Sequence, residues 1–75
     1  MDALIVLFAE CLKVPADSLD ENSSPDTVPQ WDSLAAMDLV TAIEERFQIK
    51  LSTREIMSMR TLGIARGVLK RKGVI

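Results

Sequence analysis

Ser33 is the residue in this sequence whose type and position most clearly indicate chemical use. It follows Asp32, a good N-cap, at the expected start of a helix and after a long loop, so its hydroxyl should be exposed. An anionic group attached there would meet free backbone N–H groups and the positive end of the helix dipole. Asp-Ser-Leu is a common tripeptide, however, and on this tripeptide alone a plain capping role is favoured.

The composition excludes a self-contained active site. The chain has no His, which removes Ser-His and Cys-His pairs, an imidazole base and His-ligated zinc. The single Cys11 can form neither an internal disulfide nor a cysteine metal cluster, and the three Gly residues make no phosphate-binding loop. We expect no catalytic residue and no metal site, so a partner enzyme must catalyse any reaction at Ser33.

Charge is distributed unevenly along the chain, whose net charge is -2. Residues 1–45 hold ten acids and one base, whereas residues 46–75 hold eight bases and one acid. The acidic half can attract basic partners over long range. Lys70, Arg71 and Lys72 lie where a last helix would end, and they either complement its dipole or contact an anionic partner. Nucleic acid binding is not expected, because the front half is acidic and aromatic residues are few.

The 75 residues are enough for one domain, residues 1–75, and no segment indicates a membrane span. The apolar run 3–9 lies between Asp2 and Glu10, and it is far shorter than the roughly 20 residues that cross a bilayer. It also lacks the basic region and cleavage site of a signal peptide. We expect a cytoplasmic monomer without membrane insertion. The start at Met1 and the charged last helix favour a free-standing protein.

Helices and one long loop are the expected elements. Residues 2–13 are almost continuously apolar, and their length and spacing favour a buried helix. Residues 14–31 contain all three Pro and many Asp and Ser, which is typical of a loop, and a loop this long in so small a domain is often functional. Leu19 and Val28 should pack this loop against the core.

Residues 32–47 form the most regular segment, a helix that Asp32 begins. On a helical wheel the core face collects five apolar residues: Ala36, Leu39, Val40, Ile43 and Phe47. The opposite face collects Ser33, Leu34, Met37, Asp38, Thr41, Glu44 and Glu45. Apolar contacts within an acidic rim suit a docking surface, but a solvated face with scattered apolar residues explains them equally well.

Two shorter helices should complete an all-α fold. Ser52-Thr53-Arg54-Glu55 is a capping-box pattern that predicts a short third helix, and Thr61 should cap the last one. Gly63 and Gly67 weaken that last helix by about 1 kcal/mol each relative to Ala, and we expect them to be merely tolerated.

The combined pattern resembles the acyl carrier proteins. The resemblance covers nearly the whole chain, from the apolar first helix and the long loop to the Thr-Leu-Gly that opens the last helix. It is most specific in Trp31-Asp32-Ser33-Leu34-Ala35-Ala36-Met37-Asp38-Leu39-Val40 and in Ile43-Glu44-Glu45-Arg46-Phe47. The fold it implies is a small four-helix bundle, with three main helices, a short third helix and a long loop between helices 1 and 2.

The resemblance also implies a function. In this family a phosphopantetheinyl transferase uses coenzyme A and magnesium to attach phosphopantetheine to the serine, here Ser33, and the arm's thiol carries acyl groups as thioesters between enzymes. The chain would thus be a phosphoprotein and an enzyme substrate, not an enzyme. Asp32 would engage the transferase and its metal. Basic patches on partner enzymes would dock on Asp38, Glu44 and Glu45, with Leu34 and Met37 as apolar contacts. Met57 and Met59 either line a cleft for the acyl chain or belong to an ordinary filled core.

Three departures from the family pattern indicate a specialised carrier. Carriers of fatty acid biosynthesis usually have Gly where this chain has Trp31, they are acidic throughout, and they often have another acid at the position of Arg46. Polyketide biosynthesis, other secondary metabolism, and acylation of a sugar or lipid are the candidate pathways. Asp32 favours an acyl over an aminoacyl or peptidyl cargo. The alternative from another class is a helical interaction domain whose Ser33 is never modified.

Overall fold

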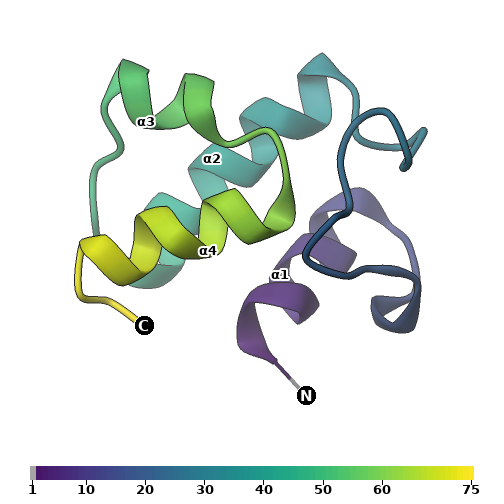
Figure 1. Cartoon of the computed structure of the whole chain (residues 1–75), viewed down its shortest axis with the longest axis horizontal. Coiled ribbons are helices and arrows are strands. Elements are labelled where there is room, and N and C mark those ends of the chain that lie inside the picture. The colour runs from purple at the N-terminus through teal and green to yellow at the C-terminus, as the bar shows by residue number, and fades with distance from the viewer. Residues whose placement is uncertain (1) are drawn as a thin grey trace.

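Four α-helices and one 3-10 turn make up the computed structural model, which describes residues 2–75 (Figure 1). The elements are α1 (Ala3–Leu12), η1 (Ala16–Ser18), α2 (Ser33–Phe47), α3 (Thr53–Ser58) and α4 (Leu62–Arg71). Residues 2–75 contain no strand. The predicted all-α fold, with its short third helix and its long loop between α1 and α2, is confirmed.

Each α-helix begins at the residue that its capping chemistry predicts. Asp32 Oδ1 accepts a hydrogen bond from the Ala35 N–H at 2.9 Å, and Asp2 caps α1 in the same way. Ser52 and Glu55 form the complete capping box of α3. Thr61 caps α4. Side-chain caps therefore fix where α2 starts, which sets the position of Ser33.

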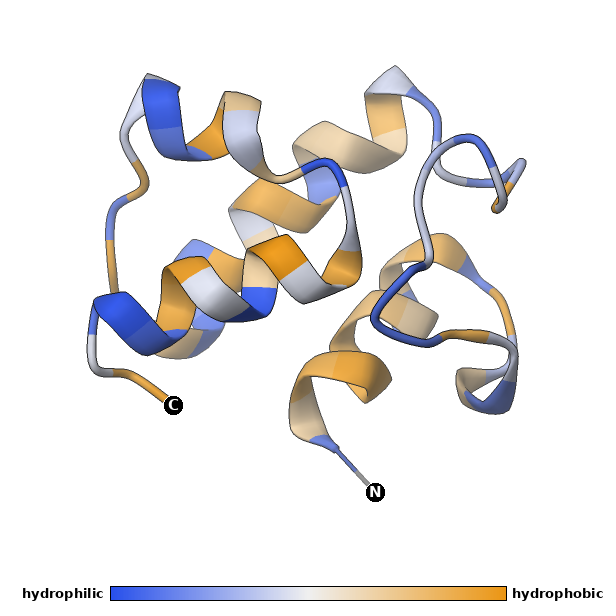
Figure 2. Ribbon diagram, viewed as in Figure 1, coloured by the Kyte–Doolittle hydropathy of each residue, from blue (hydrophilic) through white to orange (hydrophobic). Residues whose placement is uncertain are grey.

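The core is mostly aliphatic and is drawn from all three long helices. Its most deeply buried side chains are Phe8 and Leu4 of α1, Leu39 and Ile43 of α2, and Leu62, Val68 and Leu69 of α4. Colouring by hydropathy shows α1 as the most uniformly apolar helix (Figure 2). None of the helices described within residues 2–75 has the length and apolarity needed to span a membrane.

The helical wheel correctly predicted that the core-face residues of α2 are buried or half-buried. Leu39 and Ile43 are buried, whereas Ala36, Val40 and Phe47 are half-buried. Ala35, which the wheel left out of the core face, is buried as well. The core face of α2 is therefore wider than the wheel predicted.

The long loop is fixed to the core at several points. Leu19 and Val28 are buried, as predicted. Two backbone hydrogen bonds tie the loop to the start of α4: Leu62 N–H donates to the Ser23 carbonyl at 3.0 Å, and Gly63 N–H donates to the Glu21 carbonyl at 2.9 Å. The loop is therefore a packed part of the fold, and it delivers the chain to Asp32 in a defined position.

The prediction that both glycines of α4 are merely tolerated is wrong for Gly63. A Cβ atom at this position would lie 2.9 Å from the Glu21 carbonyl oxygen, a separation that real side chains do not reach. Gly63 is thus required for the close approach of loop and helix. Gly67 agrees with the prediction, since a Cβ atom there would meet nothing within 4 Å.

Candidate functional site

Ser33 is exposed and is the first residue of α2. Asp32 satisfies the Ala35 N–H, and the Asp32 carbonyl accepts from the Ala36 N–H at 2.9 Å. Within residues 2–75 the N–H groups of Ser33 and Leu34 have no hydrogen-bond partner. Two backbone donors at the positive end of the helix are thus free beside the Ser33 hydroxyl, an arrangement that suits a phosphate diester.

Trp31 anchors the chain immediately before the site. Its side chain is buried, and its ring meets the Phe8 ring edge to face, with centroids 5.5 Å apart. Its backbone N–H donates to the Val28 carbonyl at 2.9 Å. This residue, which departs from the family pattern, therefore joins the end of the loop to α1 and holds the start of α2 in place.

The outer face of α2 is mostly as predicted. Leu34 is 78% exposed and Met37 is 64% exposed, and Asp38, Thr41 and Glu45 are exposed as well. Large apolar side chains open to solvent next to acidic ones are the composition of an interaction surface.

Glu44 is the exception on this face. It is half-buried, and its Oε2 accepts a hydrogen bond from the Leu51 N–H at 2.8 Å. Sequence reasoning placed Glu44 with the exposed acids because the wheel could not show that the chain folds back along α2 after Phe47. Its carboxylate holds the segment between α2 and α3.

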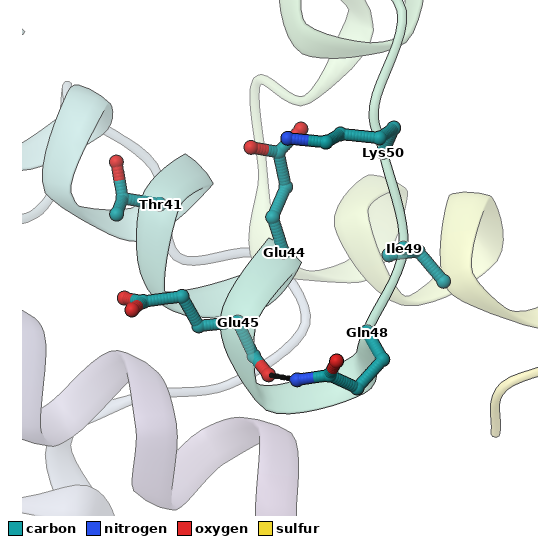
Figure 3. Close-up of a pocket in the computed structure, with 6 residues that line it drawn as sticks. All are labelled: Thr41, Glu44, Glu45, Gln48, Ile49 and Lys50. Atoms are coloured by element: carbon teal, nitrogen blue, oxygen red, sulfur yellow. Dashed lines mark hydrogen bonds between the residues drawn. The ribbon is translucent and has the colours of Figure 1, made fainter.

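An open depression lies at the end of α2, between the last turn and the segment that follows it (Figure 3). Its lining residues are Thr41, Glu44, Glu45, Gln48, Ile49 and Lys50. Gln48 Nε2 donates to the Glu45 carbonyl at 2.7 Å and shapes its rim. The depression is open, and its surface is as apolar as it is polar, so it suits contact with a protein surface better than enclosure of a small molecule.

A small apolar cavity of about 60 Å³ lies next to the Ser33 end of α2. Its lining comes from α1, the loop, α2 and α3, namely Phe8, Trp31, Ala36, Met37, Leu39, Val40, Ile56 and Met59. Ala36 and Met37 follow Ser33 by three and four residues, which places them one helical turn away on the same side. The cavity is thus close to the base of any group attached to Ser33.

This cavity tests the two predictions about methionines. Met59 lines it, which agrees with the first of the two alternatives, whereas Met57 is 70% exposed and fits neither. Sequence reasoning did not include Phe8, Trp31 and Ile56. The helical wheel assigned Ala36 and Val40 to the core face and did not indicate a cavity on this side of α2.

The chain's own thiol is poorly suited to carry a cargo. Burial raises the pKa of the Cys11 thiol, and the nearby carboxylates of Asp38 and Glu10 raise it further. Cys11 therefore stays protonated and weakly nucleophilic at neutral pH.

The all-α fold and the exposed Ser33 at the start of a capped helix are consistent with the resemblance found in the sequence. Comparison with protein-family models agrees: the model described as "Phosphopantetheine attachment site" matches residues 2–63. Comparison with curated proteins gave no significant match. The chain belongs to the phosphopantetheine-attachment family, and it is a non-catalytic carrier protein of the acyl carrier type that bears a covalent phosphopantetheine.

Proposed function

We propose that Ser33 is the attachment point and that the arm carries acyl groups as thioesters between enzymes of a specialised biosynthetic pathway. The observation that supports this most strongly is the exposed Ser33 hydroxyl beside two unpartnered backbone N–H groups at the start of α2. The matched region of the chain includes this helix start. The cytoplasmic location, the monomeric state and the single-domain organisation that the sequence predicts are part of the same proposal.

The modification transfers one group and needs no oxidant. Ser33 Oγ forms a bond to the phosphorus of coenzyme A that bears the pantetheine, and the bond from that phosphorus to the bridging oxygen breaks. Adenosine 3′,5′-bisphosphate leaves, and a base of the transferase takes the Ser33 proton, because this chain has no His to do so. The free N–H groups of Ser33 and Leu34 would be the donors available to the new phosphodiester.

The cavity beside α3 supports an acyl cargo with a small apolar end. At about 60 Å³ it is under half the size of the roughly 150 Å³ cavity that holds a benzene ring in another protein. A short acyl end fits it, and a longer chain requires α3 to move away from α2. An aminoacyl cargo would bring an ammonium group against an apolar lining, which is costly.

Docking of basic partner enzymes is assigned to the exposed acids of α2. Asp38 and Glu45 supply charge, and Leu34 and Met37 supply apolar contact near Ser33. Single exposed ion pairs are weak and screened by salt, so binding should be brief and salt-sensitive. Brief docking suits a carrier that visits several enzymes, since the tethered cargo reaches a high local concentration at each.

Intact mass tests the proposal. The purified chain is incubated with coenzyme A, magnesium and a broad-specificity phosphopantetheinyl transferase. We expect a gain of one phosphopantetheinyl group in the unaltered chain and none in Ser33→Ala, with circular dichroism showing that both are helical. An equal gain in Ser33→Ala would contradict the assignment of Ser33.

The kind of cargo is tested by attaching arms that carry different acyl or aminoacyl groups. Coenzyme A derivatives with short acyl, long acyl and aminoacyl groups are transferred to Ser33, and the thermal midpoint of each product is measured. We expect the short acyl arm to raise the midpoint above that of the free thiol arm, because its end fills the cavity. A larger increase with the aminoacyl arm would contradict the acyl assignment.

A further inference from the structure

The fold accounts for most of the bases in residues 46–75. Arg66 pairs with Asp2 at 2.6 Å and with Glu21 at 2.8 Å, which ties α4 to α1 and to the loop. Lys72 pairs with Glu55 at 3.1 Å. The remaining bases near helix ends are Arg46 in the last turn of α2 and Lys70 and Arg71 in the last turn of α4, where cations complement the dipole.

Arg54 and Arg60 have no such role in the fold. Both are exposed, and within residues 2–75 neither takes part in an ion pair. Arg54 is in the first turn of α3, and Arg60 directly precedes Thr61, the N-cap of α4. A cation near a helix N-terminus is electrostatically disfavoured. Arg54 therefore does not stabilise α3 through the helix dipole, whereas Arg60 lies between the C-cap of α3 and the N-cap of α4, where the two dipoles act in opposite directions. The exposed, unpaired charge of Arg54 in particular argues for a role outside the chain.

These arginines lie on either side of an exposed apolar residue of α3 in the sequence. Met57 is 70% exposed and is three residues after Arg54, so the two share one side of α3. Ile56 of α3 and Met59, the C-cap of α3, line the cavity together with Met37 of α2, so α3 and the first half of α2 lie on two sides of this cavity. Figure 1 shows α3 and the start of α2 along the same side of the molecule, the upper one in this view.

The exposed surfaces of α2 and α3 therefore differ in charge. On the α2 side Leu34 and Met37 are followed by the acids Asp38 and Glu45. On the α3 side Met57 lies between two arginines. An enzyme that fits both sides needs basic groups opposite α2, acidic groups opposite α3, and apolar contact between them.

We propose that Arg54, Met57 and Arg60, here called the α3 edge, form a docking surface for the phosphopantetheinyl transferase and take acidic groups on that enzyme. The inference rests on the proposed function. The transferase is the partner that the geometry favours, because it must bring coenzyme A to the Ser33 Oγ before any arm exists. Enzymes that act later can meet the cargo at the end of the arm, farther from α3.

Charge-reversal substitutions distinguish a specific contact at the α3 edge from a general effect of the net charge of the carrier. If the transferase presented only basic groups, converting any arginine to Glu would speed modification by making the carrier more acidic. If the transferase instead presents acidic groups to the α3 edge, the same substitutions should slow modification. Arg71→Glu is the matched control, because it makes the same change at an exposed residue at the other end of the chain's last helix.

The experiment measures kcat/KM for modification by a broad-specificity transferase, followed by intact mass at low and at high salt. For Arg54→Glu and Arg60→Glu we expect a decrease of about three- to tenfold at low salt, shrinking as salt rises. Arg71→Glu should stay within about twofold of the unaltered chain. Rates for the α3 edge variants that equal or exceed that of Arg71→Glu would overturn the proposal.

A binding measurement keeps this inference distinct from the assignment of Ser33. The same three substitutions are placed in the Ser33→Ala chain, and calorimetry gives the Kd of each for the transferase loaded with coenzyme A. Weaker binding of the Arg54 and Arg60 variants supports the α3 edge whether or not Ser33 is the modified residue. Unchanged binding, or no detectable binding of the Ser33→Ala chain, overturns it. Modification of a residue other than Ser33 would change the intact mass of the Ser33→Ala chain and would not affect this comparison of Kd values.

Discussion

At the scale of single residues, Asp32 has two roles that can be separated. Its carboxylate caps α2 through the Ala35 N–H, and the resemblance to carrier proteins assigns the same carboxylate to the transferase and its metal. Asn keeps a capping oxygen but removes the charge, whereas Ala removes both.

We expect Asp32→Asn to leave the free energy of unfolding nearly unchanged and to slow modification of Ser33. Asp32→Ala should slow it similarly and also cost about 1 kcal/mol of stability. Denaturant unfolding and the rate of mass gain measure the two effects. A rate for Asp32→Asn equal to that of the unaltered chain would mean that Asp32 is only a cap.

Of two adjacent acids near the end of α2, one has a structural role and the other is free for docking. Glu44 accepts a hydrogen bond from the Leu51 backbone, whereas Glu45 is exposed. Glu44→Ala should destabilise the fold by about 1.5–3 kcal/mol, because a charged acceptor is lost and the Leu51 N–H is left unpaired. Glu45→Lys should leave stability within about 0.5 kcal/mol and weaken docking of a basic partner.

Thermal unfolding and turnover by a basic partner enzyme separate these outcomes. If Glu45→Lys proved the more destabilising of the two, the division between structural and docking acids would be wrong.

At the scale of elements, the contact between the loop and α4 holds the site in place. The sequence does predict the helices, because their caps and apolar periodicity are local signals. It does not reveal that the Glu21 carbonyl approaches Gly63, or that Glu44 reaches the Leu51 backbone, because both contacts depend on how segments pack against one another. The wheel likewise could not find the cavity, whose lining comes from four segments.

The two glycines of α4 give a matched test of this contact. Gly63→Ala should destabilise by about 1–3 kcal/mol, because its Cβ atom would force the Glu21 backbone away. Gly67→Ala should stabilise by about 0.5–1 kcal/mol, because its Cβ atom meets open space and Ala favours the helix. Urea unfolding of both variants measures the difference. Equal effects of the same sign would show that the loop does not hold α4 closely.

At the scale of the whole molecule, Arg66 links three parts of the chain. Its guanidinium forms two hydrogen bonds with the Glu21 carboxylate, at 2.8 and 2.9 Å, and also pairs with Asp2. The hydrogen bond from Arg66 holds the pKa of Glu21 below its usual range. The stabilisation is complete above the ordinary Glu pKa of about 4.3 and is lost as the pH falls through the lowered value.

We therefore expect the fold to lose stability below about pH 4.3 and Glu21→Gln to reduce that loss. At pH 7 the same substitution should cost less than about 1 kcal/mol, since Glu21 is half exposed. Unfolding free energies at a series of pH values test this. A Glu21→Gln chain with an unchanged acid slope would exclude this pair as a source of the pH dependence.

The separation of charge along the sequence is only partly a property of the fold. Arg66 and Lys72 join basic and acidic segments, whereas the acids of α2 and the arginines flanking α3 remain exposed around the site. The net charge of -2 therefore describes the molecule poorly. Its interactions should depend on which face a partner meets.

The most direct test of the central claim is to locate the arm on the chain. After modification, cleavage at basic residues yields a peptide of residues 14–46, which contains Ser18, Ser23, Ser24 and Ser33. Fragmentation of this peptide in a mass spectrometer assigns the added group to one serine. We predict that it is found on Ser33 alone. Its location on any other residue would contradict the proposed site and, with it, the roles given to the surfaces around it.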